Sequence, residues 1–335
     1  AASARGARGG GPLRADERGA ISRMGFAGNA LMSDRGREPG PPSEGAPSLD
    51  LLREFLGHVM NLTYSCEDAE RVGADHDGGY VWCNDAAPHP KPEGGCTLFG
   101  YGIDSEDEFE QQVAEWGCQV HEFDPTVERT QGEHAYPDRV HFHREGAADA
   151  QGTVEGLGPV DSMEHHMQKF GPKEVAAGDW LAVKMDIEEA EWLTLSAAPD
   201  SLLERLDILI VEFHQICEDE KLLTDLRGRV ELLRRLKELF YVYHVHANNW
   251  GDEDYLPGQE LQRYRSRRPF PGSEGQYYIP AYAELSFVRK ASVERNKKAG
   301  AGPFLAHREL DHRNAVDFPA VWLEPDVFPL PPAAP

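Results

Sequence analysis

The stretch that decides the fold reads Cys96-Thr97-Leu98-Phe99-Gly100-Tyr101-Gly102-Ile103-Asp104-Ser105-Glu106-Asp107-Glu108. An apolar run leads into a Gly-x-Gly turn, and acidic residues then precede an apolar pattern with helical spacing. A strand joined to a helix through glycines is the usual entry to a nucleotide site in a doubly wound sheet. We expect Ser105 to be the N-cap of this helix, with Glu108 completing a capping box.

The charge of this turn indicates which nucleotide it accepts. A dinucleotide fingerprint would place a third glycine at Ser105 and leave the helix N-terminus free for a pyrophosphate. S-adenosylmethionine carries a sulfonium and no phosphate, so an acidic turn favours this cofactor over NAD, FAD or ATP. Four carboxylates crowd the turn, where they repel phosphate and attract a cation: those of Asp104, Glu106, Asp107 and Glu108.

The composition is that of one acidic α/β domain with long tails. A chain of 335 residues with 40% hydrophobic residues can bury a large core. Its formal net charge of −24 works against nucleic-acid partners and anionic membranes, and it contains no apolar run long enough to cross a bilayer. We expect a disordered arm over residues 1–48, a catalytic domain over 49–291, and a charged, then Pro-rich tail over 292–335.

The cysteines have neither a zinc nor a redox spacing. There are five, and none forms a Cys-x-x-Cys pair, so we expect buried free thiols rather than a disulfide framework. Asn61-Leu62-Thr63 is a glycosylation sequon, which matters only if the chain enters the secretory pathway. The sequence begins at Ala1 and not at Met, which is compatible with a removed N-terminal signal or anchor. The compartment and the oligomeric state are left open.

Acidic residues stand where the predicted parallel strands end. The second predicted strand, residues 119–123, is followed by Asp124, which lies 24 positions after Gly100. An acid at that separation accepts hydrogen bonds from ribose hydroxyls in nucleotide-binding sheets. After the third predicted strand, residues 139–143, Asp149 is a candidate for contact with the adenine.

The central strands end in a second group of polar residues. Ligands of open parallel sheets bind at the carboxyl ends of the strands, so we expect a catalytic site built from Asp186, Glu188, Glu212, His214 and Asn248. His214 is the leading candidate for the general base, because an unperturbed histidine pKa of about 6.5 lies nearest neutral pH. Glu212 is its rival if burial raises the pKa of that carboxyl. A structural hydrogen-bond network is the alternative for both.

An upstream turn offers candidate substrate contacts. Asp77-Gly78-Gly79-Tyr80 is either a plain hairpin turn or a turn that closes over the ligand, and both interpretations are left open. In the second, the substrate contacts Asp77, Gly79 and Tyr80, together with Asn249 beyond the sixth predicted strand.

These motifs resemble the class I S-adenosylmethionine-dependent methyltransferases, and within that class the methyltransferase-like and FkbM-type family. The resemblance covers residues 50–290 and implies an α/β fold. The sheet would be doubly wound, mostly parallel and seven-stranded, with an antiparallel last strand over residues 283–289. Four segments carry the resemblance: Asp77-Gly78-Gly79-Tyr80-Val81, Phe99-Gly100-Tyr101-Gly102, His121-Glu122-Phe123-Asp124-Pro125 and Lys184-Met185-Asp186-Ile187-Glu188.

The resemblance also implies residue roles and an activity. Asp186 and Glu188 would face the site of methyl transfer. FkbM-type members are mostly associated with methylation of hydroxyls on small molecules or glycans. The family usually has glycine where Glu189 stands, and this difference favours one alternative, a non-catalytic module that keeps the cofactor as a structural ligand. A nicotinamide dehydrogenase is a weaker alternative. The cofactor contacts implied are Gly100, Tyr101, Gly102 and Asp124.

Histidines near the strand ends raise the question of a metal ion. Alternate residues of a strand point to the same face, so several histidines could assemble with Asp186 and Glu188. No compact ligand motif such as His-Glu-x-x-His occurs, and we therefore expect no metal dependence. If a metal were bound, magnesium or manganese would suit the carboxylates better than zinc. The histidines concerned are His141, His143, His214, His244 and His246.

Overall fold

The computed structural model describes residues 49–90, 95–104, 106–174, 178–214, 216, 219–248, 267–269, 278–280, 282–295 and 307–312. The arm over residues 1–48, Asn249 and most of the expected tail lie outside these ranges.

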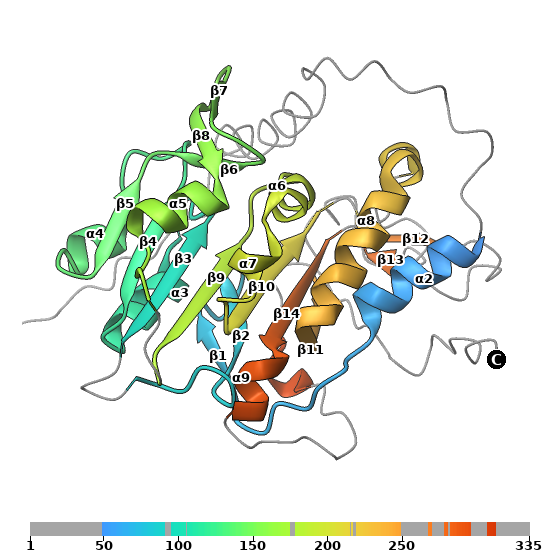
Figure 1. Ribbon diagram of the computed structural model, residues 1–335, viewed down its shortest axis with the longest axis horizontal. Coiled ribbons are helices and arrows are strands. Elements are labelled where there is room, and N and C mark those ends of the chain that lie inside the picture. The colour runs from blue at the N-terminus through green and yellow to red at the C-terminus, as the bar shows by residue number, and fades with distance from the viewer. Residues whose placement is uncertain are drawn as a thin grey trace, which may run out of the picture.

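A seven-stranded sheet forms the centre of the molecule (Figure 1). Its strands lie in the order β11-β14-β10-β9-β3-β4-β5. Strands β10, β9, β3, β4 and β5 are parallel, while β14 runs antiparallel to both β10 and β11. This confirms the expected Rossmann-like sheet with an antiparallel last strand. The bounds are β3 (Cys96–Tyr101), β4 (Gln119–Phe123), β5 (Val140–His143), β9 (Trp180–Met185), β10 (Ile208–Phe213), β11 (Phe240–Ala247) and β14 (Ala283–Arg289).

Each face of the sheet has its own hydrophobic core, so β3, β9 and β10 are buried along their whole length. Strands buried on both faces read as continuous apolar runs. The helices that cover one face, in front of the sheet in Figure 1, are α2 (Leu49–Met60), α5 (Met163–Phe170), α6 (Glu191–Ala197) and α8 (Asp219–Leu239). The opposite face is covered by α3 (Glu108–Glu115) and by an antiparallel hairpin of β1 (Ala69–Gly73) and β2 (Gly79–Cys83).

The remaining described elements are short. A three-stranded sheet follows β5, and two further strands pair near the C-terminal part of the chain. These elements are α4 (Gln131–Ala135), β6 (Gly146–Ala148), β7 (Gly152–Val154), β8 (Gly158–Ser162), α7 (Asp200–Leu203), β12 (Arg267–Pro269), β13 (Tyr278–Pro280), α9 (Lys290–Arg295) and the 3-10 helix η2 (Arg308–Leu310).

The helix after the glycine turn begins later than expected. Helix α3 begins at Glu108 with Asp107 as its N-cap residue, so the prediction that Ser105 caps it is wrong. Asp107 makes no side-chain cap bond, because its carboxylate accepts hydrogen bonds from the backbone N–H of Gly132 and the side-chain amide of Gln111 instead. The Asp107 carboxylate, which could have capped the helix locally, is therefore occupied by a tertiary contact.

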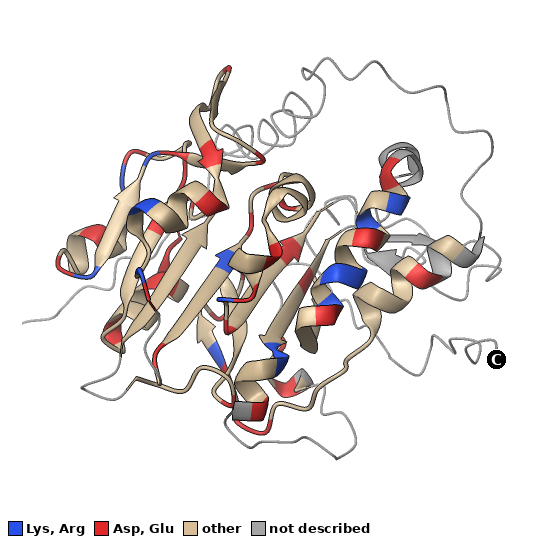
Figure 2. Cartoon of the chain, viewed as in Figure 1, with Lys and Arg blue, Asp and Glu red and all other residues tan. Residues whose placement is uncertain are grey.

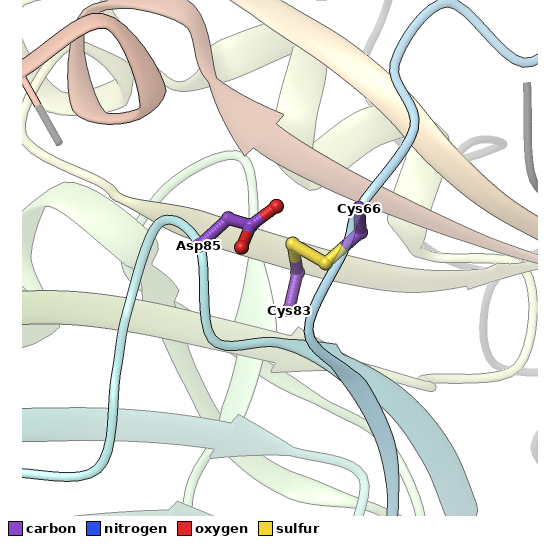
Figure 3. Close-up of side chains that lie close together, drawn as sticks. All are labelled: Cys66, Cys83 and Asp85. Atoms are coloured by element: carbon purple, nitrogen blue, oxygen red, sulfur yellow. A yellow bond between two sulfur atoms is a disulfide. The ribbon is translucent and has the colours of Figure 1, made fainter. Parts of the chain in front are cut away.

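Four of the five cysteines form two disulfides, so the expectation of free thiols is wrong for these four. Cys66 is bonded to Cys83 at the end of the β1–β2 hairpin, next to Asp85 (Figure 3), and Cys96 is bonded to Cys118. The bonded pairs are 17 and 22 residues apart. The second bond joins the beginnings of β3 and β4, which the parallel sheet places side by side.

Described residues on the C-terminal side of position 291 pack on the sheet and the hairpin. Helix α9 crosses the domain boundary expected at this position, and its Val293 is buried in the core beneath the hairpin. Residues 307–312 of the expected tail lie against the same hairpin, where the carbonyl oxygen of Leu310 accepts a hydrogen bond from Arg71. Acidic residues are spread over the whole described fold, whereas Lys and Arg are most evident on α8 (Figure 2). None of the described helices has the length and apolar character needed to cross a bilayer.

We expect the double variant Cys96→Ser/Cys118→Ser to lower the free energy of unfolding by about 3 kcal/mol, because the unfolded chain regains a loop of this size. Denaturant unfolding measures this difference, and a reductant should destabilise the parent chain more than the variant. Alkylation of the unfolded, unreduced chain should label at most one of the five cysteines. Labelling of all five would contradict the pairing.

Candidate active site

The glycine turn is pressed against the end of strand β9. Gly102 has φ +74°, and a Cβ atom at this position would lie 1.6 Å from the carbonyl oxygen of Asp186. Two backbone hydrogen bonds hold the contact: Gly102 N–H donates to Phe123 O (3.0 Å), and Asp186 N–H donates to Tyr101 O (3.0 Å). Only glycine has both the backbone freedom and the absence of a side chain that this turn requires.

Asp124 holds the same turn from the end of β4. One of its oxygens accepts hydrogen bonds from the N–H groups of Ile103 and Asp104, both at 2.9 Å, and the other accepts two from Thr126. The carboxylate is 1% exposed. The N–H groups that would cradle a phosphate are therefore already bonded within the chain. Asp124 fixes the turn, and its contact with ribose stays a prediction.

Polar side chains from four elements, β2, β9, β10 and α6, meet at the carboxyl ends of β9 and β10. The Tyr80 hydroxyl, on the hairpin, donates a hydrogen bond to Asp186 Oδ2 (2.9 Å). The His214 Nδ1 atom lies 2.8 Å from Glu191 Oε1, while its Nε2 atom lies 3.4 Å from Glu188 Oε2 and 3.8 Å from Asp186 Oδ1. The structure thus brings together Tyr80, Asp186, Glu188 and His214, and the hairpin reaches the end of β9 through Tyr80. Their roles toward substrate stay predictions.

Glu191 is the residue of this group that the sequence analysis missed. It is the first residue of α6 and is fully buried, and its Oε1 atom also accepts a hydrogen bond from the N–H of Ile187 (3.0 Å). No local signal in the sequence marks it, because Glu191 lies in a different element from His214 and the two meet only in the fold.

The second group of expected residues lies deeper in the sheet. Asn248 donates a hydrogen bond from its side-chain amide to Glu212 Oε1 (2.6 Å), and both residues are 3% exposed. Glu212 also stands directly opposite Glu284 of β14 in the strand register. Asp149 lies between β6 and β7, partly exposed, and its contact with adenine stays a prediction. Asn249 lies outside the described residues.

The charges around His214 change its expected role. Burial alone would lower the pKa of His214, but the negative charges of Glu191 and Glu188 outweigh that effect and raise the pKa well above its ordinary value. Burial raises the pKa of the Glu188 carboxyl to about 7 and that of Glu212 well above its usual range. An imidazole that already holds a proton cannot accept another. The reason for expecting His214 as the base, an unperturbed pKa, does not hold in the folded chain.

The other histidines do not join His214. His143 stacks on Phe123 near the outer edge of the sheet, close to His121. The remaining pair, on β11, faces different carboxylates: His244 Nε2 lies 2.9 Å from Asp311, and His246 Nδ1 lies 3.3 Å from Glu284. The histidines are therefore divided among separate places, and His214 alone meets Asp186 and Glu188.

Comparison with known proteins gives the family. Residues 49–255 match a family model described as a methyltransferase domain. The chain belongs to this methyltransferase family. It is 27% identical over 184 residues to the probable methyltransferase-like protein 24 of Rattus norvegicus, a match that covers 50% of this chain and 49% of the relative. The protein of the same name from Homo sapiens is 27% identical over 124 residues, covering 36% of this chain and 32% of the relative. The chain thus spans half or less of the length of these curated relatives.

One backbone feature of the candidate site is strained. Glu188 has φ +52° and Glu189 has φ +84°, so two consecutive side-chain-bearing residues adopt the left-handed conformation. Glu189 stands where the resemblance leads one to expect glycine, and its backbone takes the conformation that glycine adopts without cost. The turn after β9 therefore holds Glu189 in a backbone conformation that suits glycine better.

We expect Glu189→Gly to stabilise the chain by about 0.5–1 kcal/mol, because relief of left-handed strain outweighs the added flexibility of the unfolded chain. The matched control is Glu204→Gly, at an exposed position with φ −63°, which should destabilise the chain by a similar amount. Denaturant unfolding measures both. Equal destabilisation of the two variants would show that position 189 carries no strain.

Proposed function

We propose that the chain transfers a methyl group from S-adenosylmethionine to a hydroxyl oxygen of a small molecule or glycan. The observation that carries the proposal is the meeting of Tyr80, Asp186, Glu188 and His214 at the strand ends beside the Gly102 turn. The family supplies methyl transfer in general. The acceptor and the residue roles are inferred from the chemistry of these side chains.

The turn suits a cofactor without phosphate. Its N–H groups at Gly102, Ile103 and Asp104 are bonded to Phe123 and Asp124, so none remains for a pyrophosphate. Its acidic side chains favour the positive sulfonium. Bound there, S-adenosylmethionine would supply an electrophilic methyl group, and the turn would hold the cofactor at the carboxyl ends of β3 and β4.

The charge of the site favours oxygen over nitrogen as the acceptor. Nearby carboxylates raise the pKa of an amine and keep it protonated, so that it has no lone pair to attack the methyl carbon. A hydroxyl acceptor instead benefits from nearby carboxylates, because one of them can take its proton as the new bond forms. The side chains of Asp186 and Glu188 are 24% and 29% exposed, whereas that of His214 is 6% exposed. The two carboxylates are the groups that an acceptor can reach.

The non-catalytic alternative rested on Glu189, which the turn holds in a left-handed conformation. Turnover separates the two functions. Methyl transfer from labelled cofactor to any acceptor in a cell extract, lost on substitution of Asp186, supports the enzyme. Cofactor binding with no transfer to any acceptor supports the binding module.

We expect S-adenosylhomocysteine to bind the chain in calorimetry, and Asp124→Ala to weaken this binding because the glycine turn loses its support. Asp186→Asn should bind the ligand with nearly unchanged affinity and lose roughly 100-fold or more in turnover. The control Asp138→Asn, at an exposed position before β5, should behave like the parent chain. No binding at millimolar ligand, together with no effect of Asp124→Ala, would overturn the proposal.

A further inference from the structure

The imidazole of His214 is oriented so that one nitrogen faces two carboxylates. Its Nδ1 atom contacts Glu191 Oε1 at 2.8 Å, and Glu191 is fully buried and held in turn by the N–H of Ile187. With Nδ1 donating to Glu191, Nε2 is the ring atom free to meet a ligand, and a metal ion bound there would take the place of the Nε2 proton. The Nε2 atom points toward Asp186 and Glu188, so the ring presents a ligand nitrogen to two carboxylates.

The distances from His214 Nε2 to the two carboxylates are too long for strong hydrogen bonds and close to the spacing of two ligands on one metal ion. Nε2 lies 3.4 Å from Glu188 Oε2 and 3.8 Å from Asp186 Oδ1. Both exceed the roughly 2.7–2.9 Å of a charge-assisted hydrogen bond. Two ligands that each lie about 2.1 Å from a divalent ion are separated by roughly 3.0–3.6 Å. The spacing at Nε2 is close to this range.

The outer atoms of these groups are already held in place. Tyr80 donates to Asp186 Oδ2, which leaves Oδ1 facing His214, and Glu191 orients the imidazole through Nδ1. Metal sites characteristically hold their histidine and carboxylate ligands by such outer hydrogen bonds. Outer hydrogen bonds thus fix the directions of the Asp186 carboxylate and of the His214 imidazole.

An independent observation indicates a missing partner. Within the described part of the chain, Glu191 Oε2 is buried and accepts no hydrogen bond. One ligand atom from each of Asp186, Glu191 and His214 lies within 4.8 Å of the others. The one lysine on this end of β9, Lys184, donates to the carbonyl oxygen of Gly102 instead. The His214 imidazolium can offset only one of the carboxylates around it, and a divalent ion in place of its Nε2 proton would neutralise more of this buried negative charge.

We propose that Asp186, Glu191 and His214 bind a divalent cation, with Glu188 as a further carboxylate beside the Nε2 atom of His214. Two carboxylates with one imidazole suit Mn²⁺, which accepts both ligand types. If the proposed function holds, the ion would bind the acceptor hydroxyl and make its proton easier to lose. This inference revises the sequence-based expectation of no metal.

The test is a titration of the metal-depleted chain with Mn²⁺, followed by electron paramagnetic resonance and calorimetry without cofactor. We expect one ion per chain. Asp186→Asn, Glu191→Gln and His214→Gln should each weaken binding by roughly 100-fold. Mn²⁺ should raise the unfolding temperature of the parent chain more than that of these variants. His141→Gln is the matched control and should bind as the parent does, because His141 lies on β5 beside Gln119.

No Mn²⁺ binding at millimolar concentration would overturn the metal site. Binding that survives both Asp186→Asn and His214→Gln would do the same, and Asp186→Asn keeps the test decisive if His214→Gln does not fold. The proposed function fails separately. A chain that binds S-adenosylhomocysteine in chelator but never Mn²⁺ contradicts only the ion, and a chain that binds Mn²⁺ but no cofactor contradicts only the methyl transfer.

A second inference comes from the disulfides. Buried disulfides persist in oxidising compartments and are rare where glutathione keeps thiols reduced. The Cys66–Cys83 and Cys96–Cys118 bonds therefore indicate an oxidising compartment on the secretory route. On that route the sequon at Asn61 is a candidate site for N-glycosylation. Asn61 lies just after α2, outside any helix or strand, and is partly exposed.

We infer that the chain folds in an oxidising compartment and carries an N-linked glycan on Asn61. The side-chain amide nitrogen of Asn61 would displace the lipid diphosphate from the anomeric carbon of the sugar donor, losing one proton as the C–N bond forms. In the folded chain the Thr63 backbone N–H donates to Val242 O, and the Thr63 hydroxyl accepts from Val242 N–H. The glycan would therefore be added before this segment packs beside β11.

Expression of the full-length gene product in eukaryotic cells, followed by peptide-N-glycosidase treatment, tests this inference. We expect a single mass decrease on treatment, absent from Asn61→Gln and Thr63→Val and kept by Thr63→Ser. Thr63→Ser is the matched control because it retains both the sequon and the hydroxyl. An unglycosylated parent chain, or a mass decrease that persists in Asn61→Gln, would overturn the assignment.

Discussion

The close contact between Gly102 and the carbonyl of Asp186 is the constraint on which the rest of the site depends. A side chain at residue 102 would occupy the space of that carbonyl. The ammonium group of Lys184 also donates to the carbonyl oxygen of Gly102 (2.6 Å), so the ends of β3 and β9 are tied from both sides. The contact sets the point at which Asp186 leaves the sheet. The positions of Glu188 and Glu191 follow from it, because the strained turn after β9 leads directly into α6.

Buried charge is the second organising feature. Glu188, Glu191 and Glu212 lie with Asp186 around one imidazole, and the three glutamates are mostly or wholly buried. Removing carboxylates from water is costly unless a cation or donors compensate. A fold keeps such a group at a strand end only where packing fixes it from several directions. Here a hairpin, two strands and a helix each contribute one side of that support.

One disulfide braces the opposite end of the central strands, and the other braces the hairpin. The Cys96–Cys118 bond joins the beginnings of β3 and β4, and the Cys66–Cys83 bond fastens the hairpin that carries Tyr80. The hydroxyl of Tyr80 can then meet Asp186 from across the sheet edge. Covalent links at one end and charged contacts at the other hold the hairpin over the strands.

The sequence by itself determined the succession of strands and turns along the chain and indicated the strand ends at which a site is expected. Apolar runs, glycine turns and acids at strand ends are local patterns, and the parallel sheet converts their order into position. Only the tertiary structure decided which cysteines pair, that Asp107 rather than Ser105 precedes helix α3, and that Glu191 orients His214. Each of these depends on the distance between residues brought together by folding. The charge state of His214 was decided in the same way, because the field of three neighbouring carboxylates exists only when β9, β10 and α6 are packed.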